Sequence, residues 1–143
     1  MPKVTVLMSV KNGEPWVAEA VGSVLAQSFT DFRFLILDNA STDSTRETIL
    51  SFNDPRIDLV PLPEDIGQTG ALNKGLGMIE SEYVARMDAD DVCLPERLAR
   101  QVAFLDGHPE AALLGTDALM IGPEGLARSC TNFPATHEEI INA

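Results

Sequence analysis

The stretch VTVLMSVKNGEPWVAEAVGSVLAQSFTDFRFLILD, residues 4–38, contains the pattern that decides the fold. Two short apolar runs, Val4–Ser9 and Phe32–Leu37, flank a segment whose apolar residues recur at helical spacing. Pro15 suits the first turn of such a helix, because proline at that position gives up no hydrogen bond. The stretch therefore predicts a strand, a helix and a second strand in succession. The helical stripe consists of Val17, Val21, Val24 and Leu25.

Similar apolar runs recur along the rest of the chain at near-regular intervals. Ile57–Leu62, Tyr83–Met87 and Ala111–Gly115 continue the series, and successive runs start 25 to 28 residues apart. Repeated alternation of strand and helix predicts an α/β fold, a Rossmann-like, doubly wound and mostly parallel sheet with both faces covered. The third run contains Asp58 and Pro61, and a charge and a proline within a strand place it at a sheet edge.

The later gaps between runs also carry helix signals. Ser44 and Glu47 form a capping-box pattern. Gly75 and Gly77 weaken the third helix, since glycine is a poor helix former. The fourth helix opens at Pro95 and closes at Gly107. The expected apolar stripes are Ile49 and Phe52 in the second helix, Leu72, Leu76 and Ile79 in the third, and Leu98, Val102 and Leu105 in the fourth.

The C-terminal part of the chain has a different character. Leu119–Ile121 and Leu126–Arg128 are joined by Gly-Pro-Glu-Gly, which predicts a β-hairpin. His137–Ile141 has the pattern of a helix that is only beginning. We therefore expect an α/β domain over residues 1–116, followed by a hairpin and an incomplete further region over residues 117–143.

The composition restricts the partners that the chain can bind. Ten Lys and Arg against 22 Asp and Glu give a net charge of −12, which argues against nucleic acids and anionic membrane surfaces. A small phosphate ligand remains possible if a divalent cation supplies positive charge. Cys93 and Cys130 have no metal or redox spacing, and the sequence has neither a membrane-helix nor a signal-peptide pattern. We expect a cytoplasmic protein.

Three loops follow predicted strands and are the candidate sites for ligand binding or catalysis. Ligands of doubly wound sheets bind beyond the carboxyl ends of the strands, where the strand order reverses. The first run is followed by Ser9–Gly13, the second by Asp38–Asp43 and the fourth by Asp88–Asp91.

The acidic loop Asp88–Asp91 gives the sharpest signal. Three carboxylates within four residues repel one another unless a cation lies between them. Hard oxygen ligands suit Mg²⁺ or Mn²⁺, which take their remaining ligands from water and from a substrate diphosphate. The alternative is a solvated acidic turn that caps the helix at Pro95.

The other two loops are more ambiguous. Asp38 and Asn39 could bind a base or ribose, but they also suit an Asx turn. Lys11 and Asn12 could contact a diphosphate or form an ordinary polar loop. Trp16 is expected to pack against the sheet. Three further residues are expected to lack a ligand role, with Cys93 facing the core and His108 and His137 at the surface.

Taken together, these segments resemble family 2 glycosyltransferases of the GT-A fold. The resemblance runs from Val4 to Thr116, and its carriers are the stretch from residue 4 to residue 45 and MDADDVCLPERL, residues 87–98. It implies a nucleoside diphosphate sugar donor, a divalent Mn²⁺ or Mg²⁺ ion and a role in polysaccharide biosynthesis. Asp90 and Asp88 would hold the metal. The residues implied for the nucleotide-sugar are Ser9, Lys11, Asn12, Asp38, Asn39 and Asp88, and Gly67–Gly75 resembles a segment near the diphosphate.

The chain departs from the family pattern at three of these positions. Many members have proline at Ser9, an aromatic residue at Lys11 and a second aspartate at Asn39, so the resemblance leaves the nucleotide open. The family's catalytic base and its acceptor-binding half are expected beyond Ala143.

The favoured reading is the donor-binding half of an inverting glycosyltransferase that acts on an acceptor hydroxyl, whether glycan, lipid or protein. The alternative is a nucleotide or nucleotide-sugar binding module without catalysis. An aspartate-nucleophile phosphatase is disfavoured by Ser9-Val10-Lys11, and a dehydrogenase by the lack of G-x-G-x-x-G after the first run. The sequence does not indicate an oligomeric state.

Overall fold

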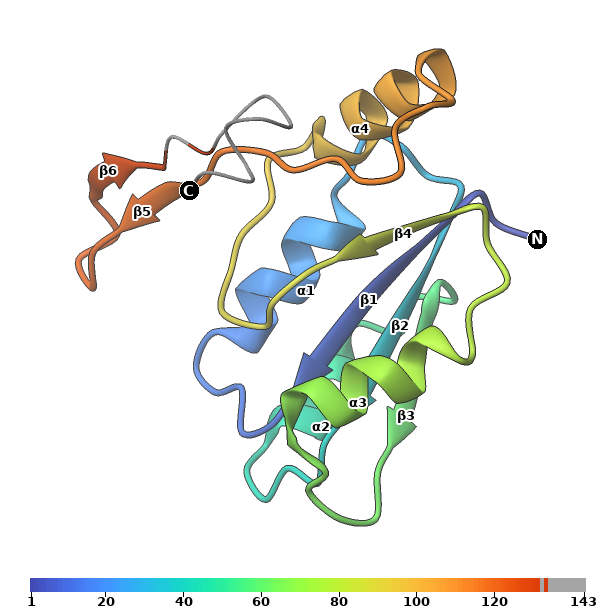
Figure 1. The fold of residues 1–143 in the computed structure, drawn as a ribbon. Helices are drawn as coiled ribbons and strands as arrows, with labels where there is room; N and C mark the ends of the chain where they lie inside the picture. Colours follow the sequence, from blue (N-terminus) through green and yellow to red (C-terminus); the bar gives the residue numbers. More distant parts are fainter. Residues whose placement is uncertain (132, 134–143) are drawn as a thin grey trace. The chain divides into compact units, whose positions relative to one another are not determined.

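The computed structural model describes residues 1–131 and 133 and divides the chain into two compact units, Met1–Asp106 and the part from Gly107 onward. The first unit contains a parallel sheet of four strands (Figure 1) in the order β3-β2-β1-β4. Its strands are β1 (Val4–Val10), β2 (Phe32–Asp38), β3 (Ile57–Pro61) and β4 (Tyr83–Arg86). Its helices are α1 (Val17–Leu25), α2 (Thr45–Ser51), α3 (Gly67–Leu76) and α4 (Arg97–Gly107).

The two central strands are buried on both faces, which explains their continuous apolar sequence. Every residue of β1 is buried, and β2 is buried except at Arg33. On one face, alternate residues of these strands pack against α1, α2 and α4. On the other face, Leu7, Leu35 and Leu37 pack with Ala71 of α3. The predicted doubly wound α/β sheet is confirmed, and β3 lies at the predicted edge.

The hairpin of the second unit is also confirmed. Strand β5 (Leu119–Ile121) pairs antiparallel with β6 (Ala127–Cys130). The fifth apolar run, Ala111–Gly115, is not a strand, so that prediction is wrong. No described strand pairs with this run, and Leu113 is 90% exposed. The helix expected at 137–141 lies outside the described residues.

Two details of the helix predictions need correction. Ser44 precedes α2 but makes no side-chain cap bond; the carboxylate of Asp43 instead accepts the backbone N–H of Thr45 at 3.1 Å. Helix α3 ends at Leu76, which is half exposed, so Ile79 lies beyond the helix. The buried residues of α3 are Ala71 and Gly75, although Leu72 and Ile79 pack partly against the same cluster.

Gly75 faces the sheet because the helix lies very close to it there. A Cβ atom on Gly75 would lie 2.5 Å from Leu7 Cδ1 and 2.8 Å from Leu37 Cδ2. The glycine that weakens the helix signal in the sequence is thus the residue that allows α3 to approach β1 and β2.

Replacing this glycine by alanine is expected to destabilise the fold despite a better helix propensity. Gly75→Ala gains about 1 kcal/mol of helix propensity but overpacks the core at a cost of roughly 1–3 kcal/mol. A net loss of roughly 1 kcal/mol should appear in urea unfolding. Gly77→Ala is the control, since its Cβ would meet only ordinary contacts. Equal stability of the two variants would contradict the tight approach of α3.

An ion pair fastens the beginning of β3 to neighbouring elements. Arg56 donates from Nε and Nη2 to Asp54 at 2.9 and 2.7 Å, and from Nη2 to the carbonyl of Leu25 at the end of α1 at 3.1 Å. Its guanidinium also lies over the ring of Phe32, 4.7 Å from the centroid. The hydrogen bonds from Arg56 outweigh the desolvation of the carboxylate and lower the pKa of Asp54 to about 2.

This ion pair predicts a pH-dependent stability. Because the pKa of Asp54 is lower in the folded chain than its ordinary 3.8, the contribution is present above pH 4 and is lost as the pH falls toward 2. Asp54→Asn should lower the free energy of unfolding by roughly 2 kcal/mol at pH 6, and the difference from wild type should vanish near pH 2. Asp31→Asn, at an exposed position, serves as the control. A pH-independent difference would show that the ionisation of Asp54 is not the cause.

Candidate functional site

A cleft opens at the carboxyl ends of the parallel strands. The chain passes from β1 to β2 and β3 on one side and then returns to place β4 on the other side of β1, so the strand order reverses between β1 and β4 (Figure 1). The cleft has a volume of about 420 Å³. It is lined by Ser9, Val10, Lys11, Asn12, Gly13, Trp16, Asn39, Asp65, Gly67, Gln68, Asp88, Ala89 and Asp90.

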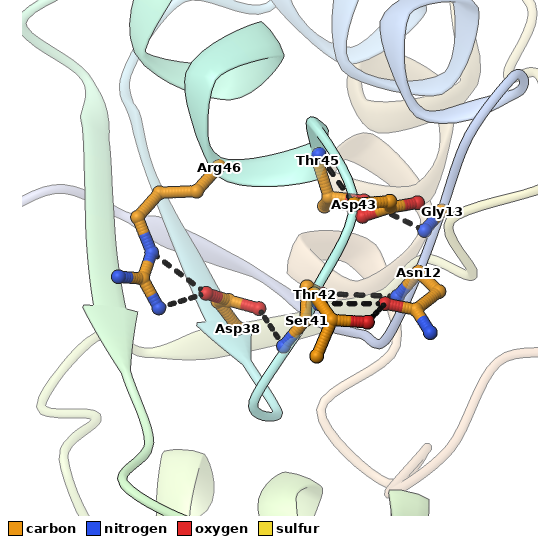
Figure 2. A network of polar contacts seen from close by, with 8 residues as sticks. All are labelled: Asn12, Gly13, Asp38, Ser41, Thr42, Asp43, Thr45 and Arg46. Atoms are coloured by element: carbon orange, nitrogen blue, oxygen red, sulfur yellow. Dashed lines mark hydrogen bonds and ion pairs between the residues drawn. The ribbon is translucent and has the colours of Figure 1, made fainter.

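The loop after β1 is fixed to the loop after β2 by hydrogen bonds (Figure 2). Asn12 has a φ of 52°, a conformation that asparagine tolerates better than most residues. Its Oδ1 accepts the backbone N–H of Thr42 at 2.8 Å, and its own N–H donates to Ser41 Oγ at 3.0 Å. The N–H of Gly13 donates to Thr45 Oγ1 at 2.8 Å. Asn12 therefore lines the cleft and holds the two loops together.

Asp38 does not line the cleft, although its neighbour Asn39 does. The carboxylate of Asp38 is completely buried, and Arg46 donates to its Oδ2 from Nε at 2.9 Å and from Nη2 at 2.6 Å. The backbone N–H of Ser41 donates to its Oδ1 at 3.0 Å (Figure 2). Burial raises the pKa of Asp38, but the hydrogen bonds from Ser41 and Arg46 outweigh burial, and the net pKa lies below its ordinary value.

Asp65, in the loop between β3 and α3, joins two of the predicted site residues. Lys11 Nζ lies 2.6 Å from Asp65 Oδ2, and Asn39 Nδ2 donates to Asp65 Oδ1 at 2.6 Å. The hydrogen bond from Lys11 is the main cause that lowers the pKa of Asp65. Asp65 was not among the site residues predicted from the sequence; its signal was an acidic residue two positions before Gly67, in the loop that follows the third strand.

Asp88 and Asp90 of the acidic loop both line the cleft. Arg86 Nη2 donates to both carboxylate oxygens of Asp88, at 2.9 and 3.0 Å, whereas Asp90 is exposed. Desolvation raises the pKa of the adjacent Asp91, and the negative charges of Asp90 and Asp88 raise it further. The loop thus gathers negative charge and hard oxygen atoms, which fit a divalent cation.

The acidic loop is not by itself a complete metal cage. Among residues 1–131 and 133, no three His, Cys, Asp or Glu side chains come together in a group that could hold a metal ion. Incomplete protein coordination is compatible with Mg²⁺ or Mn²⁺, because these ions keep several waters and take ligands from substrate phosphates.

The remaining predicted residues fall in different surroundings. Ser9 lines the cleft and is 9% exposed. Trp16 is 51% exposed and lines the cleft, so the prediction that it packs against the sheet is wrong. It lies just before α1, whose core-facing positions are taken by smaller residues. Cys93 is buried as predicted, 3.3 Å from Ser23 Oγ, and His108 is exposed. His137 lies outside the described residues.

Residues 5–129 match the family described as Glycosyl transferase family 2. The chain is 34% identical over 146 aligned residues to the "Putative glycosyltransferase EpsE" of Bacillus subtilis, with 99% of this chain and 52% of that protein covered. It is 30% identical over 102 residues to "UDP-Glc:alpha-D-GlcNAc-diphosphoundecaprenol beta-1,3-glucosyltransferase WfgD" of Escherichia coli, covering 71% of this chain and 40% of WfgD. The chain thus spans about half the length of such relatives, or less.

Two solved structures support the same relationship. S. aureus TarS 1-349 in complex with UDP-GlcNAc matches with a TM-score of 0.71 and 27% identity, over 75% of this chain and 32% of TarS. The mannosyltransferase PcManGT from Pyrobaculum calidifontis, in complex with GDP-Man and Mn²⁺, matches with a TM-score of 0.67 and 29% identity, over 73% and 32%. Helices formed by the described part of the chain are all too short or too polar to cross a membrane. By sequence and fold, the chain belongs to glycosyl transferase family 2.

Proposed function

We propose that the cleft binds the nucleoside diphosphate sugar donor of an inverting glycosyltransferase, together with a divalent cation. The observation that carries the proposal is the cleft itself, which lies at the point where the strand order reverses. It brings together every predicted site residue except Asp38. Family membership supports the same reaction class. TarS and PcManGT are named as complexes with UDP-GlcNAc and with GDP-Man and Mn²⁺.

Asp88 and Asp90 are the residues proposed to hold the Mn²⁺ or Mg²⁺ ion. Their carboxylates are hard donors, and both line the cleft. When bound, such an ion neutralises the charge that develops on the leaving nucleoside diphosphate. Arg86 positions the carboxylate of Asp88 through its two hydrogen bonds, and it limits the net negative charge of the loop.

The loops after β1 and β2 are proposed to hold the nucleoside and the diphosphate. Lys11 supplies an ammonium group at the cleft, and Ser9 supplies a hydroxyl. Asn39 presents its amide beside Asp65. We propose that Asp38 acts from behind the cleft, since its bonds to Arg46 and Ser41 fix the turn that carries Asn39.

The general base is proposed to lie in the part of the relatives' length that this chain does not span. Transfer to an acceptor hydroxyl needs a base within about 2.6–3.2 Å of that hydroxyl. Among the described residues that line the cleft, the carboxylates are Asp65, Asp88 and Asp90. Asp65 is paired with Lys11, and the other two are assigned to the metal. Residues 1–116 would then form the donor domain and 117–143 the beginning of the acceptor side.

The second candidate is a nucleotide or nucleotide-sugar binding module without catalysis of its own. Its supporting observation is the same lack of an unassigned carboxylate among the described cleft residues. A donor site would be present under either proposal, so transfer to an acceptor decides between them.

Asp90 provides the test of the metal and nucleotide site. Calorimetry with Mn²⁺ and a nucleoside diphosphate should show weak metal binding alone and tighter binding of the two together. Asp90→Asn should weaken this combined binding at least about tenfold, because one hard ligand is lost. Asp31→Asn changes the net charge equally but precedes β2, at the opposite end of the strands. Wild-type binding by Asp90→Asn would contradict the assignment of Asp90.

The 143-residue chain is also expected to bind a donor without transferring its sugar at an enzymatic rate. Transfer needs a base that the described cleft residues do not supply, whereas donor hydrolysis with water as acceptor can still be slow but measurable. The purified chain would be incubated with Mn²⁺, a panel of nucleotide-sugars and candidate acceptors. Glycosylated acceptor formed at ~1 s⁻¹ or faster, within the usual range of enzymes, would show that the chain carries its own base.

A further inference from the structure

Three cleft-lining side chains form a row in which a carboxylate lies between two hydrogen-bond donors. Lys11 and Asn39 come from the loops after β1 and β2, and Asp65 comes from the loop after β3. The central carboxylate binds the ammonium of Lys11 through Oδ2 and the amide of Asn39 through Oδ1, each at 2.6 Å. Three separate loops therefore present one joined set of polar groups to the cleft.

The hydrogen bonds determine which of these atoms are donors. The backbone N–H of Ile66 donates to Asn39 Oδ1 at 3.0 Å, which fixes the amide orientation and leaves Nδ2 as the donor toward Asp65. Asp65 Oδ1 accepts a second bond from the N–H of Gly67 at 2.9 Å. Asp65 Oδ2 has Lys11 as its only partner among the hydrogen bonds of the described residues. The spare acceptor capacity of the carboxylate is therefore on Oδ2.

The donors at the two ends of the row also have spare capacity. An ammonium group carries three N–H bonds and a primary amide two, and each of these groups uses one on Asp65. The row thus offers the cleft a donor, an acceptor and a donor in that order. Its ideal complement is a ring N–H that lies between two carbonyl oxygens, which is the imide edge of uracil.

We propose that Asp65 determines the base preference of the cleft by accepting the imide N–H of a uracil ring, with Lys11 and Asn39 donating to its two carbonyls. Cytosine has an unprotonated ring nitrogen at this position, and adenine also presents an acceptor there. Guanine has a ring N–H, but an amino group replaces one of the two carbonyls. With each of these bases, at least one donor of the row faces another donor, or the acceptor of the row faces another acceptor. Such an unsatisfied polar pair weakens binding.

This inference rests on the proposed binding of a nucleoside diphosphate, and a structural role of Asp65 must be separated from it. The carboxylate also accepts the N–H of Gly67, two residues along the chain, in the pattern of an Asx turn just before α3. Asparagine forms this turn as aspartate does, so Asp65→Asn keeps the hydrogen bond to Gly67. Gly67 and Asn39 both donate to the Oδ1 position, which obliges the new amide to place its oxygen there and its NH₂ group at the position of Oδ2. The substitution thereby converts the central acceptor into a donor.

The first experiment uses the unaltered chain. Calorimetry in Mn²⁺ would compare UDP, CDP, GDP, ADP and UDP methylated on the imide nitrogen. UDP should bind at least about tenfold more tightly than each of the others, the ratio typical of one unsatisfied polar group. Equal binding of UDP and its methylated form would overturn the role of Asp65 while leaving the proposed nucleotide binding intact. Absence of binding by every nucleotide would overturn both proposals.

The second experiment tests whether the base preference depends on Asp65. Asp65→Asn should reduce the ratio of UDP affinity to CDP affinity at least about tenfold, because the new donor repels the imide N–H and suits the ring nitrogen of cytosine. Glu64→Gln, an exposed neighbour with the same change of charge, should leave the ratio unchanged. Circular dichroism and the thermal midpoint should match wild type in both variants. An unchanged ratio in folded Asp65→Asn would overturn the inference.

Discussion

Burial of β1 and β2 on both faces is the constraint on which the rest of the structure depends. Helices cover both sides of these strands, so their side chains have no route to solvent except at the strand ends. Polar side chains that could bind a ligand are consequently concentrated where β1 ends at Val10 and where β2 ends at Asp38. Asp38 is the one charged residue of β2 that is fully buried, and it remains ionised because Arg46 and Ser41 supply donors to both of its oxygens. Desolvation of a buried carboxylate offsets much of its attraction to its partners, but the hydrogen bonds of Asp38 still hold the turn that follows β2.

The turn that Asp38 holds also determines the positions of residues at the cleft. The turn anchored by Asp38 carries Asn39, whose amide meets Asp65, and Ser41, whose hydroxyl accepts the N–H of Asn12. Packing thus fixes the ends of the strands, and hydrogen bonds between the loops fix the segments that follow them. A site built in this way is preorganised, so a ligand loses less free energy to the ordering of side chains when it binds. The loops contain non-glycine residues with positive φ, namely Asn12 and Ala40, a conformation that persists only where the surrounding structure holds it in place.

The sequence predicts the sheet well because apolar runs and helical stripes are local signals, and the burial that produces them is a property of single strands. It predicts α3 poorly because close packing of Gly75 against Leu7 and Leu37 depends on a distant strand, and a glycine carries no periodic signal. The strand prediction for Ala111–Gly115 is wrong for a related reason, because an apolar run forms a strand only where another strand pairs with it. In the cleft, loop positions identified Lys11 and Asp90 but not Asp65. The role of Asp65 arises from contacts with residues 26 and 54 positions away, and spacing along the chain does not reveal such contacts.

The charge of the cleft limits which ligands it can accept. Lys11 is the only cationic residue among the described residues that line it, and its ammonium is already paired with Asp65. Arg86, the last residue of β4, is likewise paired with Asp88. Among the described residues that line the cleft, none has an unpaired positive charge, so a diphosphate that entered alone would meet the carboxylates of Asp88 and Asp90 in a chain with a net charge of −12. A divalent cation reverses the sign of this interaction, because the carboxylates then attract the ion and the ion attracts the diphosphate. Under the proposed function, the acidic loop and an anionic donor would therefore bind as parts of one ternary complex, and the affinity of each ligand would depend on the presence of the other.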